Sequence, residues 1–254
     1  MGKFTNQTVK RTLLATNILT IAVLTVVVVK ENYPSRIYNK FFNNSVTQKT
    51  KETDCQYPLK YYDFHYRKET NTPSVIMLGN SLIRHGKWDS LLNRKDVINR
   101  GISGDNLKCI CERLAYLKNS TAKIIFVEGG INDIPGNNVD TLYNYYKQIV
   151  NFWQTKNKIP VINLVLYISP KAGVKFPSRT DYKLINTTVK NLNDKLRSFA
   201  IDNKIEFIDL NPLLSNEQSL QLEDKYTTDG VHLTTEAYKI WSEEIENVLN
   251  RHSI

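Results

Sequence analysis

The sequence predicts an α/β protein with a three-layer, doubly wound, five-stranded parallel sheet and helices on both of its faces. From Pro73 onward, short apolar runs alternate with amphipathic stretches, which is the pattern of consecutive βα units. Hydrophobic residues make up 41% of the chain and charged residues 23%, values typical of a folded globular protein. We expect the five strands at residues 75–78, 97–99, 123–128, 161–167 and 205–208.

Apolar residues recur at helical spacing in three stretches between and after these strands. The predicted helices cover residues 106–117, 184–199 and 235–250, and each has one apolar face that would pack on the sheet. The stretch at residues 169–180 contains Pro170, Gly173 and Pro177 and is predicted as a connection without regular structure. A connection of this length can border a ligand.

The chain begins with a segment that predicts a membrane anchor. Residues 12–29 form an uncharged run rich in Leu, Ile, Val and Ala, flanked by Lys10, Arg11 and Lys30. As a helix rising about 1.5 Å per residue, the run reaches roughly 27 Å, close to the hydrocarbon thickness of a bilayer. A cleaved secretory signal is the alternative, but no small-x-small cleavage site precedes Lys30.

Basic residues orient this anchor and divide the chain. Lys3, Lys10 and Arg11 in an acid-free start favour a cytoplasmic amino terminus by the positive-inside rule. We therefore expect a cytoplasmic segment at 1–11, a membrane helix at 12–29, a stalk at 30–72 and a folded, extracytoplasmic domain at 73–254. The net charge of +9 lies mostly before residue 71, which suits anionic headgroups and gives no basic stripe for nucleic acid.

The three cysteines indicate neither a disulfide framework nor a metal site. Cys109 and Cys111 lie two residues apart on a predicted helix and point in different directions, and Cys55 lies in the predicted stalk. The sequence has no metal-ligand cluster, no Walker loop and no Gly-x-Gly-x-x-Gly after the first strand. We expect no metal and no cofactor.

Polar residues follow three predicted strands, at the edge where open parallel sheets bind ligands. Gly79 permits a tight turn and Ser81 begins a helix, whose amides stabilise negative charge, although serine is also a common helix cap. After the second strand, Gly104 precedes Asp105, where a helix is expected to open. After the third, Asn132 offers a neutral side-chain donor. Gly104 and Asn132 are equally compatible with ordinary turns.

A histidine with an acidic partner precedes the last predicted helix. His232 lies three residues after Asp229, a spacing that lets the carboxylate hold one imidazole nitrogen while the other faces a site. The other histidines have no such partner and are interpreted as structural: His65, His85 and His252.

In this order, Ser81, Gly104, Asn132 and the Asp229–His232 pair resemble the four sequence blocks of the SGNH (GDSL-like) hydrolases. The resemblance covers roughly residues 74–250 and implies a flavodoxin-like sheet. It implies a triad of Ser81 as nucleophile, His232 as base and Asp229 as its partner. It also implies an oxyanion hole made of the Ser81 and Gly104 amides and the Asn132 side chain.

Within that family, residues 79–133, including Asn-Arg-Gly-Ile-Ser-Gly-Asp, are most similar to bacterial platelet-activating-factor acetylhydrolase-like and sialate O-acetylesterase-like esterases. Asn80 replaces the usual Asp of the first block, a version that occurs in this branch. The resemblance implies a serine esterase whose substrate is an acetylated glycan or another small acyl ester. The alternatives are an O-acyltransferase on a cell-surface glycan, a lysophospholipase-like lipid esterase and a non-catalytic binding domain.

Overall fold

The computed structural model describes Cys55 and residues 72–134, 136–216 and 218–254. The chain divides into two compact units, Met1–Glu52 and Thr53–Ile254, and all described residues belong to the second. The predicted cytoplasmic segment, the membrane helix at residues 12–29 and nearly all of the predicted stalk lie outside the described residues. Among the residues that are described, no helix has the length and apolar character needed to cross a bilayer.

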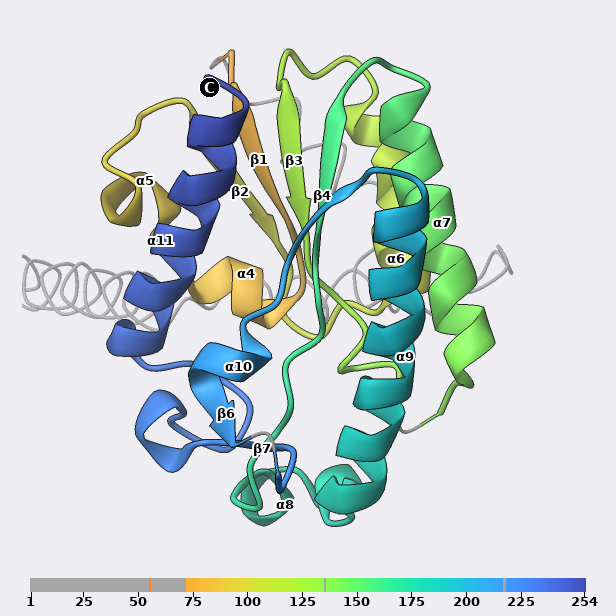
Figure 1. Ribbon diagram of the computed structural model, residues 1–254, viewed down its shortest axis with the longest axis vertical. Coiled ribbons are helices and arrows are strands. Elements are labelled where there is room, and N and C mark those ends of the chain that lie inside the picture. The colour runs from red at the N-terminus through yellow and green to blue at the C-terminus, as the bar shows by residue number, and fades with distance from the viewer. Residues whose placement is uncertain (1–54, 56–71, 135, 217) are drawn as a thin grey trace, which may run out of the picture. The chain divides into compact units, whose positions relative to one another are not determined.

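A five-stranded parallel sheet forms the centre of the second unit (Figure 1), which confirms the predicted sheet. Its strand order is β2-β1-β3-β4-β5, the order of flavodoxin-like doubly wound sheets. Val75 pairs with Val97 on one side and with Ile124 on the other. The strands are β1 (Val75–Gly79), β2 (Val97–Gly101), β3 (Ile124–Val127), β4 (Ile159–Asn163) and β5 (Glu206–Ile208).

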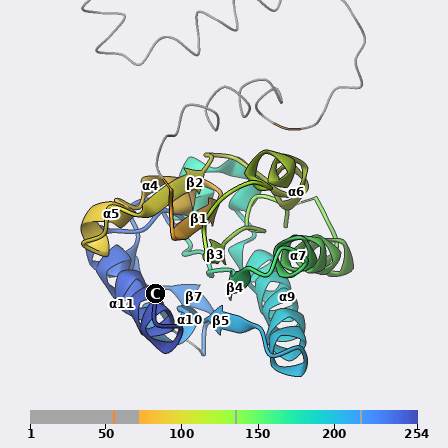
Figure 2. The same ribbon diagram turned by 90° about the horizontal axis from the view of Figure 1, so that it is seen from above.

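Helices cover both faces of the sheet (Figures 1 and 2) because its strands are apolar on both sides. In β1, Ile76 and Leu78 pack with α6 (Leu107–Arg113), α7 (Val139–Gln154) and α9 (Tyr182–Asp202). Val75 and Met77 pack with α4 (Ser81–His85), α5 (Trp88–Leu91) and α11 (Thr235–Arg251). This alternation follows the two-residue period of a strand, and each face has a continuous core.

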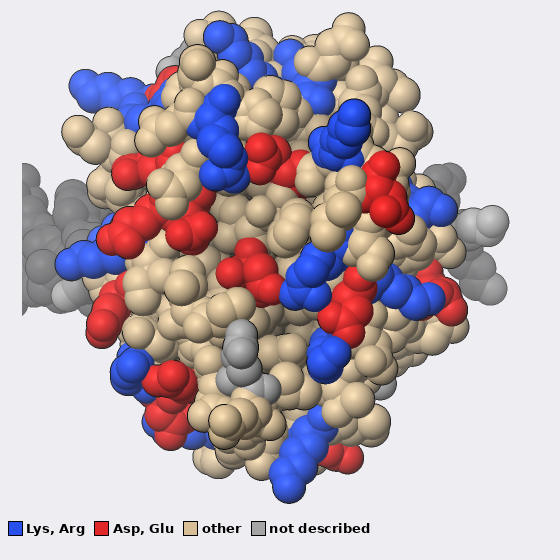
Figure 3. Space-filling model, viewed as in Figure 1, with Lys and Arg blue, Asp and Glu red and all other residues tan. Residues whose placement is uncertain are grey.

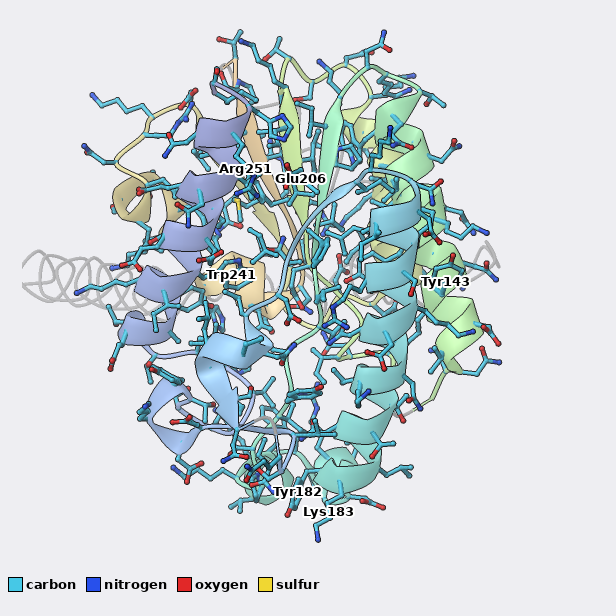
Figure 4. The ribbon with its side chains drawn as sticks, in the orientation of Figure 1. Tyr143, Tyr182, Lys183, Glu206, Trp241 and Arg251 are labelled. Atoms are coloured by element: carbon cyan, nitrogen blue, oxygen red, sulfur yellow. A yellow bond between two sulfur atoms is a disulfide. The ribbon has the colours of Figure 1, made fainter. Side chains whose placement is uncertain are left out.

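The predicted helices are confirmed with shifted ends. The helix expected at residues 106–117 begins at Leu107, because Asn106 rather than Asp105 accepts the capping hydrogen bond, from the Cys109 amide. Trp241 of α11 projects toward the sheet (Figure 4), where its indole N–H donates to Asn163 Oδ1 at 2.9 Å. The remaining short elements are α8 (Ala172–Lys175), α10 (Asn211–Leu214), the β6 (Ser215–Asn216) and β7 (Gln221–Leu222) hairpin, and 3₁₀ turns at Leu114–Leu117, Pro177–Arg179 and Asp224–Tyr226.

The strand predicted at residues 161–167 is wrong at both ends, since β4 is Ile159–Asn163. Residues 164–168 stay buried beyond the end of β4. The Leu164 amide still donates to the Ile208 oxygen at 2.9 Å, and asparagine side chains bond the backbone that follows. The Val165, Tyr167 and Ile168 amides donate to side-chain oxygens of Asn193, Asn211 and Asn186 at 2.9–3.0 Å. An apolar pattern cannot distinguish this arrangement from a strand, because both bury the same side chains.

A disulfide joins Cys55 to Cys109, which corrects the expectation of no disulfide. Their Cα atoms lie 5.3 Å apart, within the range that a disulfide can bridge. The two cysteines are 54 residues apart in sequence, so their proximity depends on the tertiary fold and no local pattern indicates it. Cys111, on the same helix, is a free cysteine. The disulfide links residue 55 covalently to α6 of the folded domain.

A buried ion pair ties together the carboxyl ends of β1 and β2. Arg113 and Asp105 have fully buried side chains, and Arg113 Nε donates to Asp105 Oδ2 at 2.8 Å. Arg113 also donates to the main-chain oxygens of Arg100, at 2.9 Å, and Gly79, at 2.8 Å. One guanidinium therefore holds the end of β1, the end of β2 and the loop that follows β2.

We predict that Arg113→Ala strongly destabilises the folded domain. Removing one partner of a buried pair takes away the opposite charge and its hydrogen bonds, which costs about 3–5 kcal/mol and lowers Tm by roughly 10 °C in a domain of this size. Thermal unfolding followed by circular dichroism measures the effect. Lys190→Ala is the control, because it removes an exposed pair with Asp194, expected to change stability by under about 0.5 kcal/mol. Equal Tm changes in both variants would contradict the prediction.

Candidate active site

Ser81 lies at the first position of α4, directly after the turn that ends β1. A Cβ on Gly79 would lie 2.3 Å from the Glu128 main-chain oxygen, so a larger residue cannot occupy this turn without displacing the backbone that follows β3. The side chain of Asn80 caps the helix by accepting a 2.8 Å hydrogen bond from the Leu82 amide. Ser81 is buried except for 8% of its surface, so its position is well defined by the turn and the cap.

The structure brings Ser81, His232 and Asp229 into one chain of hydrogen bonds. His232 Nε2 lies 3.0 Å from Ser81 Oγ, and His232 Nδ1 lies 2.8 Å from Asp229 Oδ2. Asp229 Oδ1 accepts from the His232 and Val231 amides, so one carboxylate orients both its own loop and the imidazole. Burial acts to raise the pKa of Asp229, but the His232 and Lys175 hydrogen bonds hold it well below its usual range.

This loop is held against the segment that follows β4. Gly230 has φ +89°, and a Cβ there would lie 2.1 Å from the Ala172 nitrogen. The Ser169 amide donates to the Gly230 oxygen at 2.9 Å, and Lys175 Nζ lies 3.0 Å from Asp229 Oδ2. The connection at residues 169–180, predicted to lack regular structure, contains the short helix α8. Its contacts with Asp229 and Gly230 support the loop that bears His232.

Asn132 and Gly104 meet at the ends of β3 and β2. Asn132 Nδ2 donates to the Asp105 main-chain oxygen at 2.9 Å, next to Gly104, which has φ +81° and is exposed. The Ile102 amide donates to the Gly79 oxygen at 3.0 Å, so the loop after β2 is also bonded to the turn before Ser81. The structure therefore gathers the three predicted strand-end sites at one edge of the sheet. Their assignment as oxyanion donors stays a prediction.

Asn80, the departure from Gly-Asp-Ser, contacts a buried acid. Asn80 Nδ2 donates to Glu128 Oε1 at 3.3 Å, and both residues are almost completely buried. Burial raises the pKa of Glu128 to about 8, although the hydrogen bonds with Asn80 act in the opposite direction. Glu128 is therefore mainly protonated at neutral pH, and the turn before Ser81 carries no ionised carboxylate.

A second acid with a raised pKa holds the start of α6. Both carboxylate oxygens of Asp133 accept from the Leu107 amide, at 3.1 and 3.2 Å. Burial, reinforced by the charge of Asp105, raises the pKa of Asp133 to about 7 against the effect of that hydrogen bond. Asp133 anchors the first turn of α6 to the segment that carries Asn132.

Two residues that the sequence analysis did not assign to the site lie beside it. The ring of His85, interpreted as structural, lies with its centroid 5.0 Å from that of His232. Burial, followed by the charges of His232 and Arg84, lowers the pKa of His85. Arg179 Nη2 donates to Asn132 Oδ1 at 2.8 Å. His85 stands four residues after Ser81, which places it one helical turn away, whereas no sequence signal indicates Arg179.

A serine, an imidazole and a carboxylate in hydrogen-bond contact at the carboxyl edge of a parallel sheet are typical of acyl-transferring hydrolases. The chain belongs to the GDSL-like lipase/acylhydrolase family, whose model matches residues 76–240. The match covers more than half of the chain and confirms the resemblance to the SGNH (GDSL-like) hydrolases. Among curated proteins, none matches the sequence.

Solved structures share this fold at low sequence identity. A Streptococcus pneumoniae protein provisionally named a platelet activating factor is 22% identical, with TM-score 0.66, covering 75% of this chain and 90% of its own. A GDSL-like lipase from Bacteroides thetaiotaomicron is 21% identical, with TM-score 0.65 and coverage of 76% and 97%. A carbohydrate acetylesterase family member from Sinorhizobium meliloti is 17% identical, with TM-score 0.56 and coverage of 70% and 98%.

The raised pKa of Glu128 predicts a specific pH dependence of stability. Between the unfolded value near 4.5 and the folded value of about 8, only the folded state keeps the proton. The contribution of Glu128 to folding stability is therefore fully present below pH 4.5 and falls as pH rises through this window, by up to about 1.4 kcal/mol per pH unit. Glu128→Gln removes this contribution, so its Tm should decline less between pH 5 and 8.5 than the wild-type Tm.

Thermal melts at several pH values measure this difference. Glu206→Gln is the control, because hydrogen bonding to Arg251 lowers the pKa of Glu206, and the stability it contributes is lost as pH falls. Figure 4 shows Glu206 and Arg251 facing one another, and their atoms lie 2.9 Å apart. Parallel pH profiles for wild type and Glu128→Gln would show that Glu128 is ionised in the folded protein.

Proposed function

We propose that the protein is a serine esterase that hydrolyses small acyl esters, with acetyl as the preferred acyl group. The observation that carries the proposal is the chain of hydrogen bonds from Ser81 through His232 to Asp229, at 3.0 and 2.8 Å. A nucleophile, a base and an orienting carboxylate within hydrogen-bond reach are the elements that covalent acyl transfer requires. Membership of a lipase/acylhydrolase family supports the same reaction class.

The geometry supports a two-step mechanism. His232 Nε2 takes the proton of Ser81 as Oγ bonds to the ester carbonyl carbon. The tetrahedral intermediate collapses, the ester C–O bond breaks, and the alcohol leaves with the proton from His232. Water then loses a proton to His232, attacks the acyl-enzyme and releases the acid, and Ser81 regains its proton. Asp229 keeps the tautomer of His232 and stabilises the imidazolium that forms in each step.

We propose that three hydrogen-bond donors stabilise the negative charge that develops on the ester carbonyl oxygen. The main-chain amides of Ser81 and Gly104 and the side chain of Asn132 stand at the ends of β1, β2 and β3. Ser81 is at the amino end of a helix, where unpaired amides and the helix dipole favour negative charge. Removing one such donor typically costs about 3–4 kcal/mol of transition-state stabilisation.

The choice of a small acyl ester, on a glycan or a comparable small molecule, is supported by the structural neighbours. One structural neighbour is named a carbohydrate acetylesterase, which shows that this fold accommodates such chemistry. Pocket shape decides whether water, a glycan hydroxyl or a lipid takes part, so transferase and lysophospholipase activities remain the outcomes to test against. The described residues contain no group of His, Cys, Asp and Glu that could hold a metal ion, and the proposed steps use side chains and water.

We expect the full chain to cleave p-nitrophenyl acetate faster than the butyrate and octanoate esters, with Ser81→Ala lowering kcat by at least about 10⁴-fold. Release of p-nitrophenol measures both. Arg197→Met, on the surface of α9, is a control that should keep activity. A preference for octanoate would favour a lipid esterase. Equal rates in the wild type and in Ser81→Ala would contradict the proposal that the protein is a serine hydrolase.

We further propose that the amino-terminal run at residues 12–29 anchors the protein in a membrane, with its catalytic domain outside the cytoplasm. The Cys55–Cys109 disulfide supports this location, since disulfides form and persist mainly in oxidising compartments. On the described part of the face seen in Figure 3, basic and acidic side chains are interspersed, so that face supplies no single-sign field for binding a charged surface. The proposal therefore assigns membrane attachment to the apolar run at residues 12–29 and not to that face.

This location predicts that the protein sediments with membranes and that two of its three cysteines are oxidised to a disulfide. In cells that express the full chain, the protein should sediment with membranes, and a chain lacking residues 1–29 should not. Alkylation of the unreduced, denatured protein should modify Cys111 alone, and reduction should add Cys55 and Cys109. Cys55→Ser, the matched control, should leave two reactive thiols. Reactive Cys55 and Cys109 in the unreduced protein, or a soluble full chain, would contradict the proposal.

A further inference from the structure

Arg179 is a buried arginine beside the predicted oxyanion donor Asn132. It ends the 3₁₀ turn Pro177–Arg179, and only 8% of its surface is exposed. Its Nη2 donates to Asn132 Oδ1 at 2.8 Å, across 47 residues of sequence. The guanidinium carbon lies 5.2 Å from the centre of the Phe176 ring, and the Arg179 amide donates to the Phe176 oxygen at 2.8 Å. The turn therefore fixes the backbone of Arg179, and the Phe176 ring and Asn132 contact its guanidinium.

The contacts of Asn132 leave its carboxamide one orientation. A guanidinium only donates hydrogen bonds, so the Asn132 atom that faces Arg179 must be the oxygen. A main-chain carbonyl only accepts, so the atom that faces Asp105 must be the nitrogen. An amide nitrogen carries two hydrogens, and the Asp105 oxygen takes one of them. The second hydrogen remains for another acceptor.

The charge of Arg179 is incompletely compensated by the residues that the structure describes. Its Nη1 is buried and has no hydrogen-bond partner among them, and none of their carboxylates forms an ion pair with it. Asp229 is the carboxylate whose charge acts on it, but hydrogen bonds from His232, Val231 and Lys175 already engage the Asp229 oxygens. Burial accordingly lowers the pKa of Arg179. A fixed positive charge one hydrogen bond behind Asn132 favours the state in which negative charge develops there.

We propose that Arg179 is a positioning residue for the oxyanion hole: it fixes the Asn132 carboxamide with its N–H toward the oxyanion and strengthens that donor by its charge. The inference rests on the proposed esterase function. Without Arg179, the Asn132 side chain can rotate and present its oxygen to the substrate, which would repel an oxyanion. The effect therefore belongs to the transition state, and binding of the neutral ester depends on it little.

The test compares kcat and KM for p-nitrophenyl acetate in the full chain. Arg179→Met should lower kcat by about 10- to 100-fold with KM changed by under about threefold. Arg179→Lys, which restores a charge and one donor, should recover part of kcat. In an Asn132→Ala background, Arg179→Met should lower kcat by under about twofold further, because the group that it positions is absent. Arg197→Met, an α9 arginine paired with Asp194 and Asp209, is the matched control.

The outcomes separate this inference from the proposed function. Wild-type turnover that does not depend on Ser81 would reject the esterase itself. Ser81-dependent turnover that Arg179→Met leaves unchanged would overturn the positioning role and leave the esterase standing. So would an equal loss in the presence and absence of the Asn132 side chain, because a general structural effect lowers both backgrounds alike. If Arg179→Met does not fold, Arg179→Gln, which keeps a buried polar group, is measured against the same criteria.

Discussion

The Arg113 guanidinium makes the contacts on which the rest of the site depends. Its side chain is fully buried, and its nitrogens donate to the main chain at the ends of β1 and β2 and to the carboxylate of Asp105. Parallel strands are bonded to one another along their lengths, but the loops that leave them have no ladder to hold them. The planar guanidinium of Arg113, whose N–H donors point in fixed directions, supplies hydrogen bonds to these loops in place of a neighbouring strand. Asp105, held in this way, then offers its main-chain oxygen to Asn132.

The same principle, side chains that substitute for a missing strand, applies on the other side of the sheet. After Leu164, whose amide still donates to the Ile208 oxygen of β5, residues 165–168 have no such strand contact, and Asn193, Asn211 and Asn186 bond their backbone instead. An asparagine carboxamide has the donor and acceptor of a peptide group, so it can satisfy both. The extended, buried segment ends at Ser169, where the chain turns to support the loop that carries His232.

Sequence reasoning found the parts of the molecule that local patterns encode. The sheet followed from apolar runs, Ser81 from the glycine turn before a helix, and the contact of Asp229 with His232 from a spacing of three residues. It missed the parts that depend on distant residues meeting. The Cys55–Cys109 disulfide and the Arg179–Asn132 hydrogen bond join positions 54 and 47 residues apart. An extracytoplasmic location would favour a disulfide but does not indicate which cysteines pair.

The contact between Asn80 and Glu128 also limits how this site can change over evolution. An aspartate at position 80, the common residue of the family's first block, would place a second acid against Glu128 in a dry environment, where two neighbouring carboxylates resist ionising together. The neutral amide avoids that conflict and still caps α4. The amide at position 80 and the acid at position 128 are therefore physically coupled, and replacing Asn80 by an acid changes the surroundings of Glu128 directly.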